Sequence, residues 1–350
     1  MRALVKCRMG ALALTALALT GCGKSDDEAQ RARVEREMKT WLMSKVRAFR
    51  SAAEALQQAA PTPSGRGWSA TEDADALRRT KDAWFRAREA YEHAEGALAP
   101  VFPDSDTATD ARYDDFLAVL GAAGDPKPFD DQGVIGMHAL ERVLWADAVP
   151  PDTARFERGI PGYRAAAFPA TEAEAREFKE LLAGRLVKDI AQLERELQPL
   201  ELDIAFAFRG LIDLTNEQLE KVDRAGTGRE ESRYAQTTMR DLRANREGCL
   251  AAYQMFRPWL LARGRTDLDE QVRAGFERLK QSYDAVPGDA IPRPPVAWSS
   301  VSPNPDHFRT PFGRLFEVVS KETDDKQHRS LSSSLMSVAD ALGLPKALLR

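Results

Sequence analysis

The chain has 350 residues, of which 43% are hydrophobic and 30% are charged, and its formal net charge at pH 7 is −4. This length allows one large domain or two medium-sized domains with a substantial core. The acidic excess is small and no long basic run is present, so the sequence predicts no nucleic-acid partner.

Residues 1–21 are predicted to be a lipoprotein signal peptide. Arg2, Lys6 and Arg8 give a positive start, and residues 9–19 form an apolar core that is too short for a permanent membrane span. Leu19-Thr20-Gly21-Cys22 then matches a bacterial lipobox, so Cys22 is expected to carry a diacylglycerol. An ordinary secretory signal with an incidental cysteine is the alternative. Gly and Lys, rather than Asp, follow Cys22, which favours a periplasm-facing lipoprotein in the outer membrane.

Residues 22–32 are predicted to be the lipidated cysteine and a short polar tether. No other run of 18 apolar residues occurs, so contact with the membrane is expected through the N-terminal lipid only. Cys7 would leave with the signal peptide and Cys22 would be lipidated. Cys249 would then remain without an intrachain disulfide partner.

Apolar residues recur at spacings of three and four along most of the chain, which predicts amphipathic helices. Strand-like alternation is nearly absent. Residues 101–129 are expected to be irregular and acidic, and residues 287–311 to form a long surface connection. The predicted class is all-α, with two tandem four-helix bundles at 33–199 and 200–350. The predicted helices cover residues 34–56, 69–99, 134–145, 171–197, 201–224, 237–261, 268–283 and 313–344.

Within the predicted 134–145 helix, His138 and Glu141 lie one turn apart on a face that is otherwise apolar. Burying an ionised carboxylate without a partner costs several kcal/mol, roughly. The pair is therefore predicted either to hydrogen-bond to each other or to bind a metal ion. Imidazole with carboxylate suits iron, zinc, manganese or copper.

Two ligands are too few for a metal site, so others must come from elsewhere. Acidic residues elsewhere in the chain could supply these ligands, or each of them could lie on a solvated face. No Glu-x-x-His precedes any of the four histidines, which excludes the ferritin-like di-iron signature. Arg142 stands where a second histidine would complete His-x-x-Glu-His, and His-Glu-x-x-His is absent. The candidate carboxylates are Glu95, Glu217, Glu230, Glu231 and the aspartates of residues 101–115, namely Asp104, Asp106, Asp110, Asp114 and Asp115.

The motif Gly136-Met137-His138-Ala139-Leu140-Glu141, followed by Leu144-Trp145, resembles the Gly-x-His-x-x-Glu motif of the imelysin-like family. That family includes EfeM-type and EfeO-type periplasmic iron-uptake proteins. Ala235-Gln236 stands where the family leads us to expect Ser-His, and no cupredoxin-like group of Cys, His and Met is present. Weaker similarity extends over residues 90–95, 102–112, 230–234 and 241–248.

This resemblance implies two helical bundles and metal binding through His138 and Glu141, with acidic ligands nearby. Glu95, Glu230 and Glu231 are the candidates for those ligands. The expected function is presentation of iron, with zinc or copper as alternatives, to an uptake system that includes an inner-membrane iron permease. Affinity should fall at acid pH because the ligands must lose protons. An imelysin-type metallopeptidase and a non-catalytic binder of envelope polysaccharide or protein are the alternatives, and the thin ligand set favours a binding protein over an enzyme.

Overall fold

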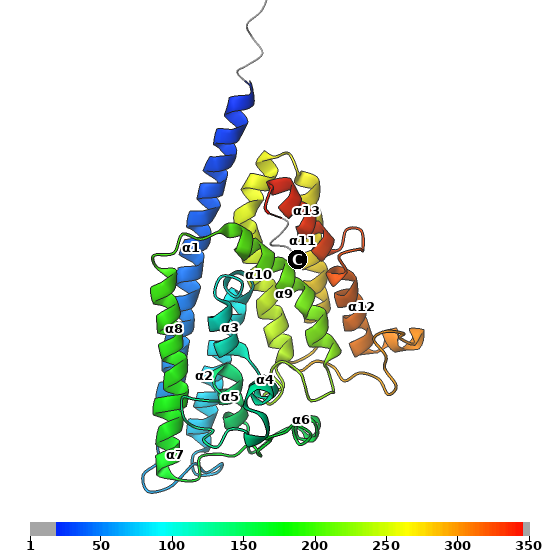
Figure 1. Cartoon of the computed structure of the whole chain (residues 1–350). Helices are drawn as coiled ribbons and strands as arrows, with labels where there is room; N and C mark the ends of the chain where they lie inside the picture. Colours follow the sequence, from blue (N-terminus) through cyan, green and yellow to red (C-terminus); the bar gives the residue numbers. More distant parts are fainter. Residues whose placement is uncertain (1–18, 346–350) are drawn as a thin grey trace, which may run out of the picture.

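The computed structural model describes residues 19–345, and within that range every regular element is a helix (Figure 1). The predicted all-α class is confirmed. The first half contains α1 (Leu19–Ala59), α2 (Ala74–Leu98), α3 (Pro103–Asp110), α4 (Tyr113–Leu120), α5 (Gly136–Leu144), α6 (Pro151–Glu157), α7 (Glu172–Glu177) and α8 (Ala183–Leu197). The second half contains α9 (Ile204–Asp223), α10 (Thr238–Ala262), α11 (Thr266–Asp284), α12 (Pro311–Thr323) and α13 (Leu331–Leu342).

Helix α1 is held in the fold by one apolar stripe along its length. The stripe packs against α2 and α8, and the helix ends just before Pro61 and Pro63, which cannot continue it. Burial of these side chains, at roughly 1.5–3 kcal/mol for each large one, holds the helix on the core. The stripe residues are almost fully buried: Val34, Met38, Leu42, Val46, Phe49, Ala53 and Leu56.

The segment predicted as a tether is the start of α1 and is helical. Asp27 already contacts the body, because its carboxylate accepts hydrogen bonds from the indole N–H of Trp259 at 2.9 Å and from Arg263 at 2.6 Å. Figure 1 shows the first turns of α1 projecting beyond the other helices. From Asp27 onward the tether is therefore fixed to α10. Residues 1–18 of the predicted signal peptide lie outside the described residues.

Helix α2 packs against α1 on one side and against α9 and α10 on the other. Glycines permit this close approach. A Cβ on Gly210 of α9 would lie 1.8 Å from the Gly96 oxygen of α2, and one on Gly248 of α10 would lie 2.2 Å from the His93 oxygen. One apolar core therefore runs through both halves of the chain. The division into bundles at residues 199 and 200 stays a prediction.

Residues 101–129, predicted to be irregular, contain the short helices α3 and α4. Pro103 occupies the first position of α3, where its missing N–H costs nothing, and Asp104 and Asp106 favour the positive helix start. Asp114 and Asp115 lie in the first turn of α4 in the same way. The acidic residues that suggested a loop therefore begin two helices, and α3 brings Asp110 to a fixed position.

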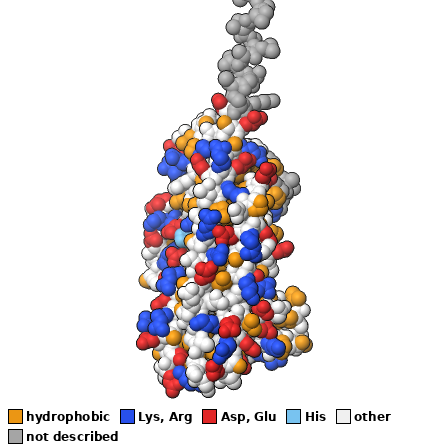
Figure 2. All heavy atoms as spheres, turned by 90° about the vertical axis from the view of Figure 1, so that its left-hand side faces the viewer, with side chains coloured by type: hydrophobic (Ala, Val, Ile, Leu, Met, Phe, Trp, Pro, Cys, Tyr) orange, Lys and Arg blue, Asp and Glu red, His pale blue; other side chains and the backbone are white. Residues whose placement is uncertain are grey.

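The face formed by α1 and α8 mixes charges of both signs. Figure 2 shows acidic and basic side chains interspersed over it. Arg50 pairs with Glu54 one turn later at 2.9 Å, and Arg47 reaches Glu194 of α8 at the same distance. No helix among residues 19–345 combines the length and apolar character that a bilayer span requires.

Candidate metal centre

Helix α5 carries the Gly-x-His-x-x-Glu motif into the core, and all nine of its residues are buried. Gly136 begins the helix with a φ of +84°, in the left-handed region that favours glycine. A Cβ at this position would lie 2.5 Å from the Ala108 oxygen and 2.6 Å from the Thr109 oxygen. Gly136 therefore allows the start of α5 to lie directly against the end of α3. This contact brings His138 next to Asp110.

His138, Asp110 and Glu231 form a compact group of candidate ligands, each offering one atom within 4.8 Å of the others. Nε2 of His138 lies 3.4 Å from Oδ1 of Asp110 and 3.7 Å from Oε1 of Glu231. The histidine side chain is 1% exposed, Glu231 is 6% exposed and Asp110 is 17% exposed. Nε2 is buried and has no hydrogen-bond partner. The three side chains come from α5, α3 and the segment between α9 and α10.

Glu141 orients the imidazole. Nδ1 of His138 donates to Oε2 of Glu141 at 2.8 Å, since an ionised carboxylate only accepts. The other carboxylate oxygen accepts the backbone N–H groups of Tyr234 at 2.9 Å and Ala235 at 2.8 Å. With Nδ1 held in this way, Nε2 faces the carboxylates of Asp110 and Glu231. The backbone N–H of Ala235 makes its bond whatever the side chain, so the departure from Ser-His does not affect this contact.

Two arginines share the carboxylates of this group. Arg88 of α2 contacts Asp110, and its Nη2 lies 3.2 Å from Oε1 of Glu231. Arg112 reaches the other oxygen of Glu231 at 3.4 Å. Sequence reasoning did not single out either arginine. The sequence feature that points to a buried Arg88 is its position on the face of α2 between Trp84 and Tyr91, both of which are buried.

The charges of the group determine its protonation. Burial would raise the pKa of Asp110, but Arg88 and His138 hold it below its ordinary value. Burial would likewise raise the pKa of Glu231, and Lys221, His138 and the two arginines bring it well below the usual range. Burial and Arg88 lower the pKa of His138, yet the carboxylates of Asp110, Glu141 and Glu231 outweigh them and the pKa lies well above its ordinary value. Without a bound ion, the neighbouring carboxylates therefore favour the protonated form of His138.

The other predicted ligands lie outside this group. Oε2 of Glu95 accepts from the Asn245 side chain at 2.8 Å and lies 3.6 Å from Lys221 Nζ. Glu230 accepts the Gly226 N–H at 2.5 Å. Glu217 lies with Glu95 and Asp106 on the wall of a separate cleft of about 390 Å³. Of the predicted carboxylates, the structure thus brings Glu231 and one loop aspartate, Asp110, to Nε2 of His138.

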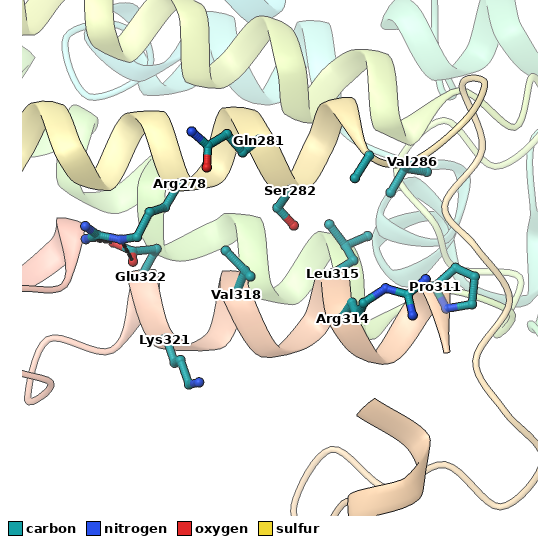
Figure 3. A pocket seen from close by; sticks show the side chains of 11 residues that line it. Arg278, Gln281, Ser282, Val286, Pro311, Arg314, Leu315, Val318, Lys321 and Glu322 are labelled. Atoms are coloured by element: carbon teal, nitrogen blue, oxygen red, sulfur yellow. Dashed lines mark hydrogen bonds and ion pairs between the residues drawn. The ribbon is translucent and has the colours of Figure 1, made fainter. Parts of the chain in front are cut away.

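A second hollow lies between α11 and α12, with a volume of about 500 Å³ (Figure 3). Its cationic side chains are already held: Arg278 donates to Glu322 at 2.9 Å, Lys321 pairs with Glu317 at 2.7 Å, and Arg314 donates to the backbone oxygen of Arg309. No histidine or cysteine lines it. This groove is therefore a poor candidate for a metal site.

Comparisons with known proteins identify the family of the chain. The Imelysin family model (Peptidase M75) matches residues 38–335. An Efem/EfeO family lipoprotein of Staphylococcus haemolyticus (strain JCSC1435) is 26% identical over 60% of this chain and 60% of its own length. The iron uptake system component EfeM of Bacillus subtilis (strain 168) is 26% identical over 76% of this chain and 53% of its own length. The chain thus spans less than two thirds of these relatives.

The fold agrees with a solved structure as well. The crystal structure of an imelysin-like protein from Psychrobacter arcticum 273-4 aligns with a TM-score of 0.57 at 11% sequence identity, covering 91% of this chain and 96% of that one. Because the family model covers residues 38–335, most of the chain, the chain belongs to the imelysin family, and it is similar to members of that family named EfeM and Efem/EfeO lipoprotein.

Proposed function

We propose that this chain is a lipid-anchored, periplasm-facing protein that binds an iron ion and presents it to an uptake system. The main support is Nε2 of His138, a buried nitrogen without a hydrogen-bond partner that faces the carboxylates of Asp110 and Glu231, whose pKa values both lie below the ordinary ones. One imidazole and two carboxylates suit iron, and also zinc or manganese. Iron is favoured because homologous chains carry the names of iron-uptake components.

In this proposal His138, Asp110 and Glu231 are the ligands. Glu141 holds the imidazole rather than the ion, because both its oxygens are already engaged. Glu95 and Glu230 have other partners and are not part of the proposed ligand set. The geometry of the site does not favour the metallopeptidase alternative, since Glu141, the carboxylate nearest to the histidine in the motif, has both oxygens engaged and is not free to act as a base.

The anchor is proposed at Cys22, from the lipobox and from the homologous lipoproteins. Attachment to the outer membrane and transfer to an inner-membrane iron permease complete the proposal. A full-length chain that stays in the membrane fraction after Cys22→Ser would contradict the anchor.

Equilibrium dialysis followed by elemental analysis tests ion binding. Purified protein is dialysed against Fe²⁺ without oxygen and, separately, against Zn²⁺. We expect the wild type to retain about one ion per chain and His138→Ala to retain almost none. His93→Ala is the matched control, because His93 lies on α2 with its Nδ1 at 2.8 Å from the Glu89 oxygen, outside the ligand group. Equal, negligible metal in the wild type and His138→Ala would refute the proposal.

A further inference from the structure

Arg88 holds the same two carboxylate oxygens that face His138. Its Nη1 contacts Oδ1 of Asp110, and its Nη2 lies 3.2 Å from Oε1 of Glu231. Nε2 of His138 lies 3.4 Å and 3.7 Å from those same two atoms. A metal ion bound to this group would use oxygens that the guanidinium now occupies. The ion and Arg88 are therefore competitors for one pair of oxygens.

The structure also offers Arg88 a second place. Its Nε is buried without a hydrogen bond and lies 3.6 Å from Oδ1 of Asp241, just beyond bonding distance. The other oxygen of Asp241 is held by the Ser232 hydroxyl at 2.6 Å, which fixes this carboxylate. Oε1 of Glu92 already contacts Arg88, while Oε2 accepts from Asn245 at 2.6 Å. A small movement toward Asp241 would give Nε the partner that it lacks.

We propose that Arg88 is a resident counter-cation that exchanges with the bound ion. In the ion-free protein it neutralises Asp110 and Glu231, whose other cationic contacts are His138 and, at Oε2 of Glu231, Arg112. When the ion binds, Arg88 leaves these oxygens and is held by Glu92 and Asp241. The inference rests on the proposed metal site. Competition from Arg88 makes ion binding weaker and more readily reversible than the ligands alone would give.

Titration calorimetry with Zn²⁺ on the whole chain tests the exchange. Arg88→Gln removes the competitor, so its association constant should rise roughly tenfold above the wild type, the value of one lost charged hydrogen bond. Its melting temperature without ion should fall. Arg112→Gln is the matched control, because it removes an equal charge from Oε2 of Glu231, the oxygen that does not face His138. The control should show a smaller rise in affinity.

A second measurement avoids the risk that Arg88→Gln fails to fold. Crystal structures of the wild type with and without Zn²⁺ should show Nη1 of Arg88 leaving Asp110 and Nε coming within hydrogen-bond distance of Asp241 when the ion is present. An Arg88 that keeps both Asp110 and Glu231 beside a bound ion would overturn the inference. So would an Arg88→Gln affinity equal to or below that of the wild type.

The two proposals fail differently. If the wild type binds neither Fe²⁺ nor Zn²⁺, the metal site itself is refuted, and the exchange with it. If the wild type binds an ion and His138→Ala does not, while Arg88 keeps its contacts with Asp110 and Glu231 beside the bound ion, only the exchange is refuted.

Discussion

At the scale of single residues, the proposed centre assigns the binding of an ion and the positioning of its histidine ligand to different side chains. His138 and Glu141 stand three residues apart, and the sequence treats them as equals. The structure gives them different tasks, because Glu141 accepts three hydrogen bonds, from Nδ1 of His138 and from two backbone N–H groups. The two interpretations left open by the sequence, a mutual hydrogen bond and a metal site, are therefore compatible.

Glu141→Gln should weaken ion binding by roughly 10 to 100-fold while the protein stays folded. If the amide oxygen keeps the two backbone N–H groups, the amide NH₂ faces Nδ1 of His138. That arrangement favours the tautomer with the proton on Nε2, which cannot bind an ion. Zn²⁺ titration calorimetry measures the loss, and circular dichroism checks the fold. Glu89→Gln, on the exposed side of α2, is the control, and unchanged affinity in folded Glu141→Gln would contradict the role assigned to Glu141.

At the scale of elements, the sequence predicted the long helices and the motif helix well, because their apolar spacing is regular. It missed α3, because aspartates that favour a helix start also resemble an acidic loop. The candidate site was predicted in part: His138 and Glu231 were named, and Asp110 was one of five loop aspartates. Nothing in the sequence shows that α3 meets α5, so Asp110 could not be distinguished from its neighbours. Arg88 could not be predicted from ligand chemistry, because a guanidinium has no lone pair to offer a metal ion.

Gly136→Ala should destabilise the protein by roughly 2–4 kcal/mol and weaken ion binding. The added Cβ meets two backbone oxygens of α3 and also strains a backbone of φ +84°. Gly121→Ala is the matched control, since Gly121 has a φ of +65° but nothing within 4 Å of its Cβ position. The free energy of unfolding in urea, measured for both variants, separates the clash from the strain. Equal losses of the free energy of unfolding in the two variants would show that the close contact between α3 and α5 does not contribute to stability.

At the scale of the whole molecule, the centre joins the two halves of the chain. Asp110 and His138 come from the first half and Glu231 from the second, and Glu141 reaches the backbone of Tyr234 across the same boundary. Because the apolar core is also continuous, a bound ion adds a polar link to helices that already pack together.

A bound ion should therefore raise the melting temperature of the whole chain, by the equivalent of about 2.7 kcal/mol at an ion concentration 100 times the dissociation constant. The pKa of His138 lies above its ordinary value, so the ion must displace a proton and this gain should increase with pH. In the ion-free protein the imidazolium stabilises the fold at acid pH, and this contribution is lost as pH rises through the raised pKa. Differential scanning fluorimetry at pH 6 and pH 8, with and without Zn²⁺, measures both effects. A rise in melting temperature with Zn²⁺ that does not depend on pH, or that persists in His138→Ala, would contradict the assignment of His138 as a ligand.

The helical start of α1 has a mechanical consequence. The carboxylate of Asp27 accepts a hydrogen bond from Trp259 of α10, and Phe49 of the same helix packs against Tyr91, one turn from Arg88, with ring centroids 5.6 Å apart. At 1.5 Å per residue, these two points of α1 are about 33 Å apart. With a lipid on Cys22, this helix would be a rigid strut that fixes the height of the centre above the bilayer. The centre could then approach the membrane only by a tilt of the whole molecule about its anchor, and a receiving partner would meet the centre and the strut as one rigid body.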